Sequence, residues 1–299
     1  MGTQVTVLAP EAAAAIAGRD IEALFAEWER ILSRFQPTSE LSRLNAARRG
    51  ATARREVLVG DLVLAVTRAA LAAAEATDGI FDPTLLHALV AEGYDRSFDL
   101  LPAARSWTGP TAVPGRGQWR DVRVDLLLRS ISLPPGVGLD FGGIAKGMAV
   151  DAAVEHLRVS GITPVVVEAG GDLAVHGAPT DGTWPIAVET GSTITNVELD
   201  RGAMATSSVA KRRWVVNGEV RHHLLDPHTG RAAATDLLSA TVVANTCREA
   251  EVAAKCALIL GEAAGGAFLD RLGLAGLLVA PDDRIVPIGG WALATGAAA

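Results

Sequence analysis

The sequence Gly138-Leu139-Asp140-Phe141-Gly142-Gly143-Ile144-Ala145-Lys146-Gly147 forms a glycine-rich junction ahead of an expected helix over residues 145–159. Its glycines allow a close approach between backbone and ligand, and the first turn of the helix offers unpaired N–H groups. Lys146 adds a positive charge, so the junction suits a diphosphate. It matches neither the Walker pattern nor the dinucleotide fingerprint. A tight turn in which Asp140 caps the helix explains the same residues equally well.

Helix and strand patterns on both sides of this junction favour an α+β fold. Apolar residues at three- and four-residue steps predict an amphipathic helix over 20–35, and Ser39 is a candidate cap for a short helix after it. Because strands and helices do not alternate regularly, α+β is favoured over a Rossmann sheet. Strands are expected near 121–133, 164–169, 184–190, 196–199, 212–216 and 238–244, Ala-rich helices over 58–77 and 247–261, and a surface loop over 100–119. Asn217-Gly218, directly after the strand at 212–216, predicts a hairpin turn.

Composition and charge restrict the possible partners. The chain has 299 residues and a net charge of −7, which argues against a nucleic acid or an anionic membrane as the main partner. No run of roughly 18 apolar residues occurs, so no membrane span is expected. The spacing of Cys247 and Cys256 fits neither a metal site nor a disulfide framework, and a cytoplasmic protein with reduced thiols is expected. With no clear linker, residues 1–299 are expected to form a single domain of two packed lobes.

Three further motifs each have a functional and a purely structural interpretation. In Glu168-Ala169-Gly170-Gly171-Asp172, the glycines admit a ligand or make a β-bulge. In His222-His223-Leu224-Leu225-Asp226-Pro227-His228-Thr229-Gly230, a histidine near an acid can serve as a general base, but the same residues are typical of a turn. In Phe81-Asp82-Pro83-Thr84, Asp82 can orient a ligand hydroxyl or cap a short helix.

The order of these motifs along the chain resembles that of the ApbE family, the FAD:protein FMN transferases. The resemblance extends from Met1 to Trp291. The motifs that carry it are Met1-Gly2-Thr3, Ser39-Glu40, Leu44-Asn45, Phe81-Asp82-Pro83-Thr84, Asp140-Phe141-Gly142-Gly143-Ile144-Ala145-Lys146-Gly147, Asp151, Gly170-Gly171-Asp172, Thr206-Ser207 and His223-Leu224-Leu225-Asp226-Pro227-His228-Thr229-Gly230.

The resemblance implies an α+β fold of two lobes, with mixed or antiparallel sheets and an FAD cleft between the lobes. It also implies that the protein cleaves the FAD diphosphate, transfers FMN to a Thr or Ser hydroxyl of an acceptor protein and releases AMP. A magnesium ion supports the diphosphate in this family. By motif matching, His223 is the base for the acceptor hydroxyl, and Gly143 and Glu251 fall at metal-ligand positions. The implied FAD contacts are Met1, Phe35, Ile80, Phe81, Asp82, Asp140, Lys146 and Leu225.

The helix that carries the metal ligands departs from the family pattern. Where the family has an Asp followed four residues later by a Thr, this sequence has Glu251 and Lys255. A protonated ammonium has no lone pair to offer a cation, and magnesium takes oxygen ligands. Three interpretations of Lys255 are open. Its ammonium replaces the metal charge, or it pairs with Glu251 and weakens the site. Alternatively, the local alignment is shifted and the metal is bound otherwise.

Three functions remain open on these residues. The first is an enzyme, which is either an FMN transferase acting on a protein or an FAD pyrophosphatase that transfers to water. The second is an FAD-binding or storage protein with little or no transferase activity. The third is an unrelated α+β scaffold in which the glycine motifs are only turns.

Overall fold

The computed structural model describes residues 3–47, 55–109, 118–180 and 182–291. It contains helices and several sheets, which confirms the predicted α+β class. These residues divide into two compact units. Unit 1 comprises described residues within 26–145 and 211–234, and unit 2 comprises described residues within 3–25, 146–210 and 235–291. Met1, one of the predicted FAD contacts, lies outside the described residues.

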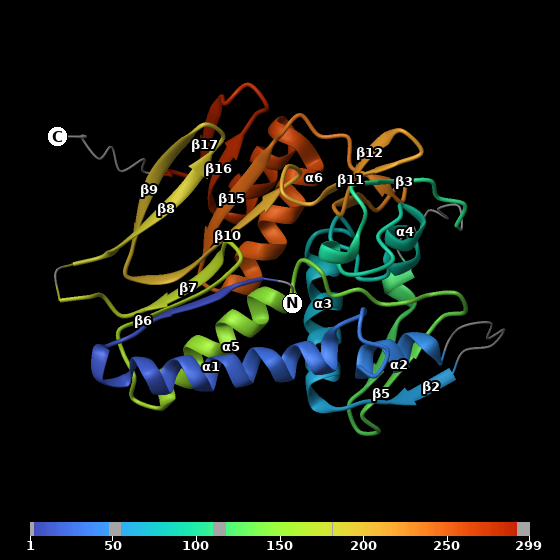
Figure 1. Cartoon of the computed structure of the whole chain (residues 1–299), viewed down its shortest axis with the longest axis horizontal. Coiled ribbons are helices and arrows are strands. Elements are labelled where there is room, and N and C mark those ends of the chain that lie inside the picture. Colours follow the sequence, from blue (N-terminus) through green and yellow to red (C-terminus); the bar gives the residue numbers. More distant parts are fainter. Residues whose placement is uncertain (1–2, 48–54, 110–117, 181, 292–299) are drawn as a thin grey trace. The chain divides into compact units, whose positions relative to one another are not determined.

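A seven-stranded sheet forms the centre of unit 2 (Figure 1). Every neighbouring pair of strands in it is antiparallel. Its strands, in spatial order, are β1 (Val5–Leu8), β6 (Val165–Ala169), β7 (Asp172–His176), β10 (Arg201–Ser208), β15 (Ser239–Ala244), β16 (Ala275–Val279) and β17 (Ile285–Ile288).

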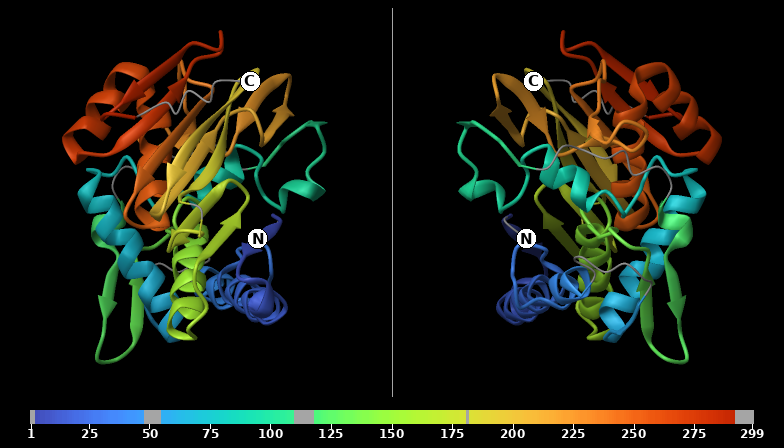
Figure 2. Two further views of the ribbon diagram at one scale, coloured as in Figure 1. Left: turned by 90° about the vertical axis from the view of Figure 1, so that its left-hand side faces the viewer. Right: turned by 90° about the vertical axis from the view of Figure 1, so that its right-hand side faces the viewer.

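The two faces of this sheet are covered by different elements (Figures 1 and 2). On one face, the hairpin of β8 (Trp184–Thr190) and β9 (Thr193–Leu199) packs through Val188 and Leu199 onto an apolar cluster that includes Met204 of β10. Helix α6 (Cys247–Leu272) packs against β10, β15 and β16. Because side chains alternate along a strand, the alanines that flank Met204 point to the opposite face and leave room for α6. The other helices are α1 (Glu11–Leu32), of which residues 26–32 belong to unit 1, and α5 (Ala145–Val159).

Helix α6 is bent at Gly261, which has a φ of 80°. Asp236 accepts a hydrogen bond from the backbone N–H of Glu262 at 2.9 Å and so caps the second half. The helix expected over 247–261 therefore ends at this bend, and a second helical segment continues from it to Leu272. By length and composition α6 is the one helix in the described residues that could cross a membrane, but 61% of its most apolar window is buried in the fold, as in an ordinary core helix.

Unit 1 is built from small sheets and short helices. Its sheets have the strand orders β2-β5-β4, β12-β11-β3 and β13-β14. Its strands are β2 (Arg55–Leu58), β3 (Ala104–Arg105), β4 (Arg123–Asp125), β5 (Ser130–Leu133), β11 (Arg213–Val216), β12 (Glu219–His222), β13 (Leu225–Asp226) and β14 (Arg231–Ala232). Its helices are α2 (Glu40–Ala46), α3 (Asp61–Ala76), α4 (Leu86–Ala91), and the 3-10 helices η1 (Phe98–Leu100) and η2 (Gln118–Asp121).

Local sequence signals located many of these elements correctly. Ser39 accepts a hydrogen bond from the N–H of Ser42 at 2.9 Å, so the predicted cap of α2 is confirmed. Asn217-Gly218 forms the predicted turn between β11 and β12, with φ values of 52° and 85°. The loop expected over 100–119 instead contains β3, which pairs in parallel with β11. Its residues 110–117 lie outside the described part of the chain.

Candidate functional site

Asp140 closes a turn in the glycine-rich junction of unit 1. Its Oδ1 accepts a hydrogen bond from the N–H of Gly142 at 2.9 Å, and its Oδ2 forms an ion pair with Nε of Arg34 at 2.7 Å. Its own N–H donates to the carbonyl of Pro83 at 2.8 Å. This hydrogen bond joins the junction to the chain directly after the predicted FAD contacts at residues 80–82, which we call the flavin segment. The tight-turn interpretation is therefore correct, although these contacts of Asp140 precede α5 and do not cap it.

Arg34 connects Asp140 to a group of aromatic rings. The Arg34 guanidinium lies 4.1 Å from the ring centre of Phe35 and 4.6 Å from that of Tyr94. The Tyr94 ring stacks on Trp214 at 5.2 Å. The family resemblance predicts Phe35 as an FAD contact. Arg34 was not among the predicted residues, and its only sequence signal is its position directly before Phe35.

Phe81 and Asp82 lie in the segment between α3 and α4. Asp82 is buried, and its Oδ1 accepts hydrogen bonds from the backbone N–H of Thr84, at 2.7 Å, and from the Thr84 hydroxyl. This is an Asx-type turn. The predicted helix-capping role of Asp82 is wrong, because α4 begins at Leu86 and the residue before it is Leu85. Phe81 is fully buried and its ring belongs to the core, whereas the neighbouring Ile80 is partly exposed.

His223 lies between β12 and the short hairpin of β13 and β14. We call residues 221–232 the His223 hairpin. Leu225 is buried and pairs with Ala232, while the Asp226 carbonyl accepts the N–H of Gly230 at 2.8 Å. The turn chemistry expected from the sequence is therefore present, and His223 stands just ahead of it, partly exposed. Burial lowers the pKa of His222, the histidine before it.

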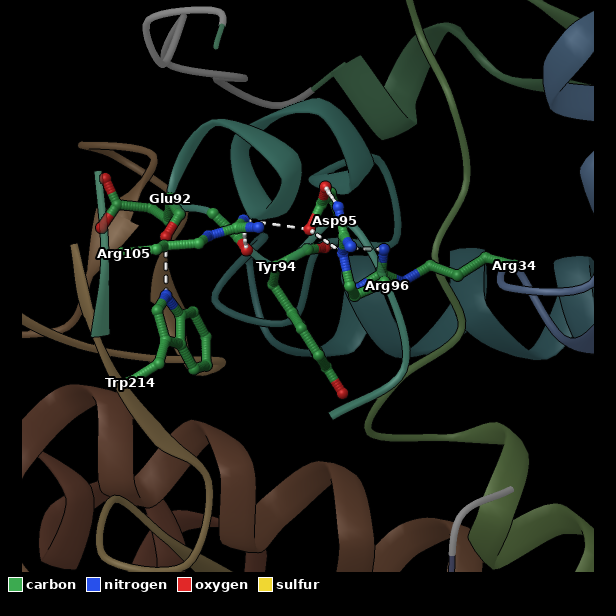
Figure 3. A network of polar contacts seen from close by, with 8 residues as sticks. Arg34, Glu92, Tyr94, Asp95, Arg96, Arg105 and Trp214 are labelled. Atoms are coloured by element: carbon green, nitrogen blue, oxygen red, sulfur yellow. Dashed lines mark hydrogen bonds and ion pairs between the residues drawn. The ribbon is translucent and has the colours of Figure 1, made fainter. Parts of the chain in front are cut away.

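A buried carboxylate that the sequence did not reveal contacts both sides of this hairpin. Glu92 ends α4, and its carboxylate lies 3.0 Å from Nε of Arg221 and 3.7 Å from Nε of Arg231. The Glu92 carbonyl accepts the indole N–H of Trp214 at 2.9 Å. Figure 3 shows the residues that follow Glu92. Arg34 donates a hydrogen bond to the Tyr94 carbonyl, and Arg105 forms an ion pair with Asp95.

In unit 2, Lys146 lies near Glu251 and Asp172. Lys146 forms a close ion pair with buried Asp172, and its Nζ lies 3.9 Å from Oε1 of Glu251. Asp172 also accepts the N–H of Thr206 at 3.2 Å. The other predicted residues described above belong to unit 1, and so does Gly143. The backbone at Gly143 has a φ of 95°, a conformation that favours glycine.

Two carboxylates of unit 2, those of Glu251 and Asp151, cap helices. Oε2 of Glu251 accepts the N–H of Gly147 in the first turn of α5 at 2.8 Å. Asp151 of α5 accepts the N–H groups of Cys247 and Arg248 in the first turn of α6, at 2.7 and 3.0 Å. Desolvation raises the pKa of Asp151 despite these two hydrogen bonds. Burial, and then the charge of Glu251, raises the pKa of Cys247 well above its ordinary value, so this thiol is a protonated core group.

These contacts do not fit a magnesium site in unit 2. Glu251 already accepts a backbone hydrogen bond and lies near one ammonium, and Lys255 follows one helical turn later. In the described parts of the chain, no group of three or more His, Cys, Asp or Glu side chains is placed to hold a metal ion.

The motif Gly170-Gly171 has a structural explanation. Both glycines have positive φ, 62° and 96°, and they form the two-residue turn between β6 and β7, in which Ala169 pairs with Asp172. Glu168 accepts the N–H of Gly171 at 2.6 Å. The predicted β-bulge is wrong, because the register of the two strands continues without an extra residue up to the turn.

The α+β fold of this chain is that of solved ApbE structures. The structure of an ApbE protein from Thermotoga maritima superimposes with a TM-score of 0.82, at 25% identity, and covers 96% of this chain and 94% of its own. The structure of the flavin transferase ApbE from Vibrio cholerae superimposes on this chain with a TM-score of 0.74, at 25% identity. The ApbE family model matches residues 1–278, and the chain belongs to the ApbE family.

Relatives with a named activity align over most of the chain. The FAD:protein FMN transferase of Vibrio cholerae is 28% identical over 272 residues, which cover 88% of this chain and 79% of that protein. The enzyme of the same name from Salmonella typhimurium is 27% identical over 265 residues, which cover 83% of this chain and 72% of that protein.

Proposed function

We propose that this protein is an FAD:protein FMN transferase, which moves FMN from FAD to a Thr or Ser hydroxyl of an acceptor protein and releases AMP. The observation that carries this proposal is the turn at Asp140, whose carboxylate is held between Arg34 and the Gly142 N–H directly ahead of Lys146 and α5. The relatives named FAD:protein FMN transferase support the reaction class. A helix start beside a lysine suits a diphosphate.

In the proposed reaction, the acceptor hydroxyl oxygen attacks the phosphorus of the FMN half of FAD. A new P–O bond forms, the bond from that phosphorus to the bridging oxygen breaks, and the bridging oxygen leaves with AMP. His223 takes the hydroxyl proton. Such a transfer requires alignment of the reacting atoms and neutralisation of oxygen charge. We assign part of that neutralisation to the Lys146 ammonium.

A second candidate is an FAD-binding protein that transfers little or no FMN. It is favoured by Glu251, whose carboxylate caps α5, and by Lys255 at the position where the family has a hydroxyl. An FAD pyrophosphatase, in which water replaces the acceptor hydroxyl, uses the same residues.

One experiment separates these functions. The purified chain is incubated with FAD and synthetic peptides that each contain one Thr or Ser, with Ala peptides as controls, in magnesium or in EDTA. Chromatography quantifies AMP and FMN, and mass spectrometry detects flavin on the peptides. AMP with flavin on a Thr or Ser peptide supports the transferase. AMP with free FMN indicates a pyrophosphatase, bound FAD without AMP indicates a binder, and no flavin binding contradicts all three.

A further inference from the structure

Glu92 contacts the chain before and after His223, on strands β12 and β14. Its side chain is only 4% exposed, and one of its carboxylate oxygens, Oε2, lies 3.0 Å from Nε of Arg221 and 3.4 Å from the N–H of Ala232. Arg221 is on β12, two residues before His223, and Ala232 is on β14, the strand that pairs with β13. A single buried carboxylate therefore contacts the His223 hairpin at both of its ends.

The other end of the same short helix is fixed to the predicted flavin segment. Helix α4 runs from Leu86 to Ala91, so Glu92 follows it directly and Asp82 lies just ahead of it. Leu85 bridges to Gly138, and the Pro83 carbonyl accepts the Asp140 N–H. Helix α4 is therefore a rigid spacer between the flavin segment and the carboxylate.

The backbone after Glu92 is also immobilised. Trp214 donates its indole N–H to the Glu92 carbonyl at 2.9 Å, and Arg105 donates to the Gly93 carbonyl (Figure 3). Arg34 donates to the Tyr94 carbonyl at 2.9 Å. These hydrogen bonds hold the backbone that carries the Glu92 side chain, so the contacts of its carboxylate restrain the position of the His223 hairpin.

We propose that Glu92 is the positioning residue for His223 and fixes the hairpin relative to the flavin segment. This inference rests on the proposed transferase function, in which His223 takes the proton of the acceptor hydroxyl. A buried charge pair that loses one member leaves the other uncompensated, so the partner moves towards water. Without the Glu92 charge, Arg221 loses its buried counterion, and the end of β12 that adjoins His223 is displaced. Small displacements of a catalytic group have large effects on rate.

Glu92→Gln tests the proposal because glutamine keeps the shape and can still accept the Ala232 N–H, but it removes the charge. We expect kcat for AMP release to fall by about tenfold to a hundredfold. The Kd for FAD, measured by quenching of flavin fluorescence, should change by less than about threefold, because the flavin segment lies at the other end of α4. Glu219→Gln is the matched control, since Glu219 is the exposed second partner of Arg221. It should leave both constants unchanged.

Arg221→Met and the double variant Glu92→Gln/Arg221→Met complete the cycle. If the two residues act as one unit, the double variant should lose no more kcat than the worse single variant. Additive losses would overturn the inference, and so would a Glu92→Gln enzyme that keeps the parental kcat or loses FAD affinity and kcat in equal measure.

Hydrogen exchange of residues 221–232 gives a readout that does not depend on activity. If the parental protein releases no AMP from FAD, the proposed function fails, but the positioning inference is still tested. We expect faster amide exchange in 221–232 for Glu92→Gln and parental exchange for Glu219→Gln. Parental exchange in both variants would sink the inference even if the enzyme is active.

Discussion

Glu251 of α6 accepts the backbone N–H of Gly147, in the first turn of α5, at 2.8 Å. Asp151 of α5 accepts the N–H groups of Cys247 and Arg248 in the first turn of α6. Each helix therefore supplies the carboxylate that caps the other, where the unpaired N–H groups of a helix start need acceptors and favour negative charge. This reciprocal arrangement explains why the Glu251 carboxylate is buried and that of Asp151 is partly buried in unit 2.

Replacement of Glu251 should separate its hydrogen bond from its charge. Glu251→Ala leaves the Gly147 N–H buried without an acceptor, and we expect a loss of about 1–3 kcal/mol in the free energy of unfolding. Glu251→Gln keeps an acceptor oxygen and should cost less than about 1 kcal/mol. Urea unfolding at pH 7 measures both. Equal losses for the two variants would show that charge, and not the cap, is the contribution of Glu251.

Gly147 should tolerate no side chain at all. A Cβ at this position would lie 2.7 Å from the carbonyl oxygen of Cys247 and 2.8 Å from the N of Arg248, both backbone atoms. Gly147→Ala must therefore push α5 and α6 apart, at a cost of about 1–3 kcal/mol. Gly18→Ala in α1 is the matched control, because nothing lies within 4 Å of its Cβ. It should stabilise the protein by roughly 0.5–1 kcal/mol. Thermal unfolding of both variants decides whether close packing is the cause.

The elements that the sequence predicted well are those specified by local chemistry. The Ser39 cap, the Asn217-Gly218 turn and the junction ahead of α5 each depend on residues that lie next to one another in the chain. Helix α1 begins at Glu11, earlier than the expected residue 20, because its first residues are mostly alanines. Alanine favours a helix by propensity but gives no apolar periodicity.

Central strand β10 was missed for a related reason. Its sequence over Arg201–Ser208 is rich in small residues and lacks the alternation of large apolar and polar side chains typical of strands. The small residues are needed because α6 packs against this strand. In the candidate site, Asp140 and Phe35 were predicted, but Arg34 and Glu92 were not. Their partners are distant in the sequence, and one sequence does not show such pairings.

Asp95 should make stability depend on acid pH. Hydrogen bonds from Arg96 first, and then from Arg105, lower the pKa of its carboxyl from 3.8 to about 2. A lowered pKa stabilises the folded state above pH 3.8, and this stabilisation is lost as the pH falls through 2. Because the Arg96 side chain is half exposed and screened by solvent, we expect Asp95→Asn to cost only about 1 kcal/mol at pH 7. The difference in unfolding free energy should shrink as the pH falls from 3.8 and vanish below pH 2, and a constant difference across this range would contradict the prediction.

Lys255 should determine whether magnesium matters to catalysis. Lys255→Thr exchanges an ammonium for a hydroxyl oxygen one turn from Glu251, which restores an oxygen ligand of the kind that magnesium takes. We expect AMP release from FAD to become dependent on magnesium in this variant, whereas EDTA should leave the parental protein unaffected. Lys255→Met removes the charge without adding oxygen and should gain no response to magnesium. A parental protein that requires magnesium would refute this account of Lys255.

Arg34 should control the affinity for FAD. Its Nε lies 2.7 Å from the Asp140 carboxylate, both side chains are largely buried, and its guanidinium stacks over Phe35. A lysine cannot reproduce the planar fork or the stacking. Arg34→Met and Arg34→Lys should therefore both weaken FAD binding, by about tenfold or more, because Asp140 and the Phe35 ring lose their common support. Arg30→Met, which removes an exposed partner of Glu27 on α1, should bind FAD like the parental protein. Titration by flavin fluorescence measures all three, and parental affinity in Arg34→Lys would mean that charge alone is sufficient at this position.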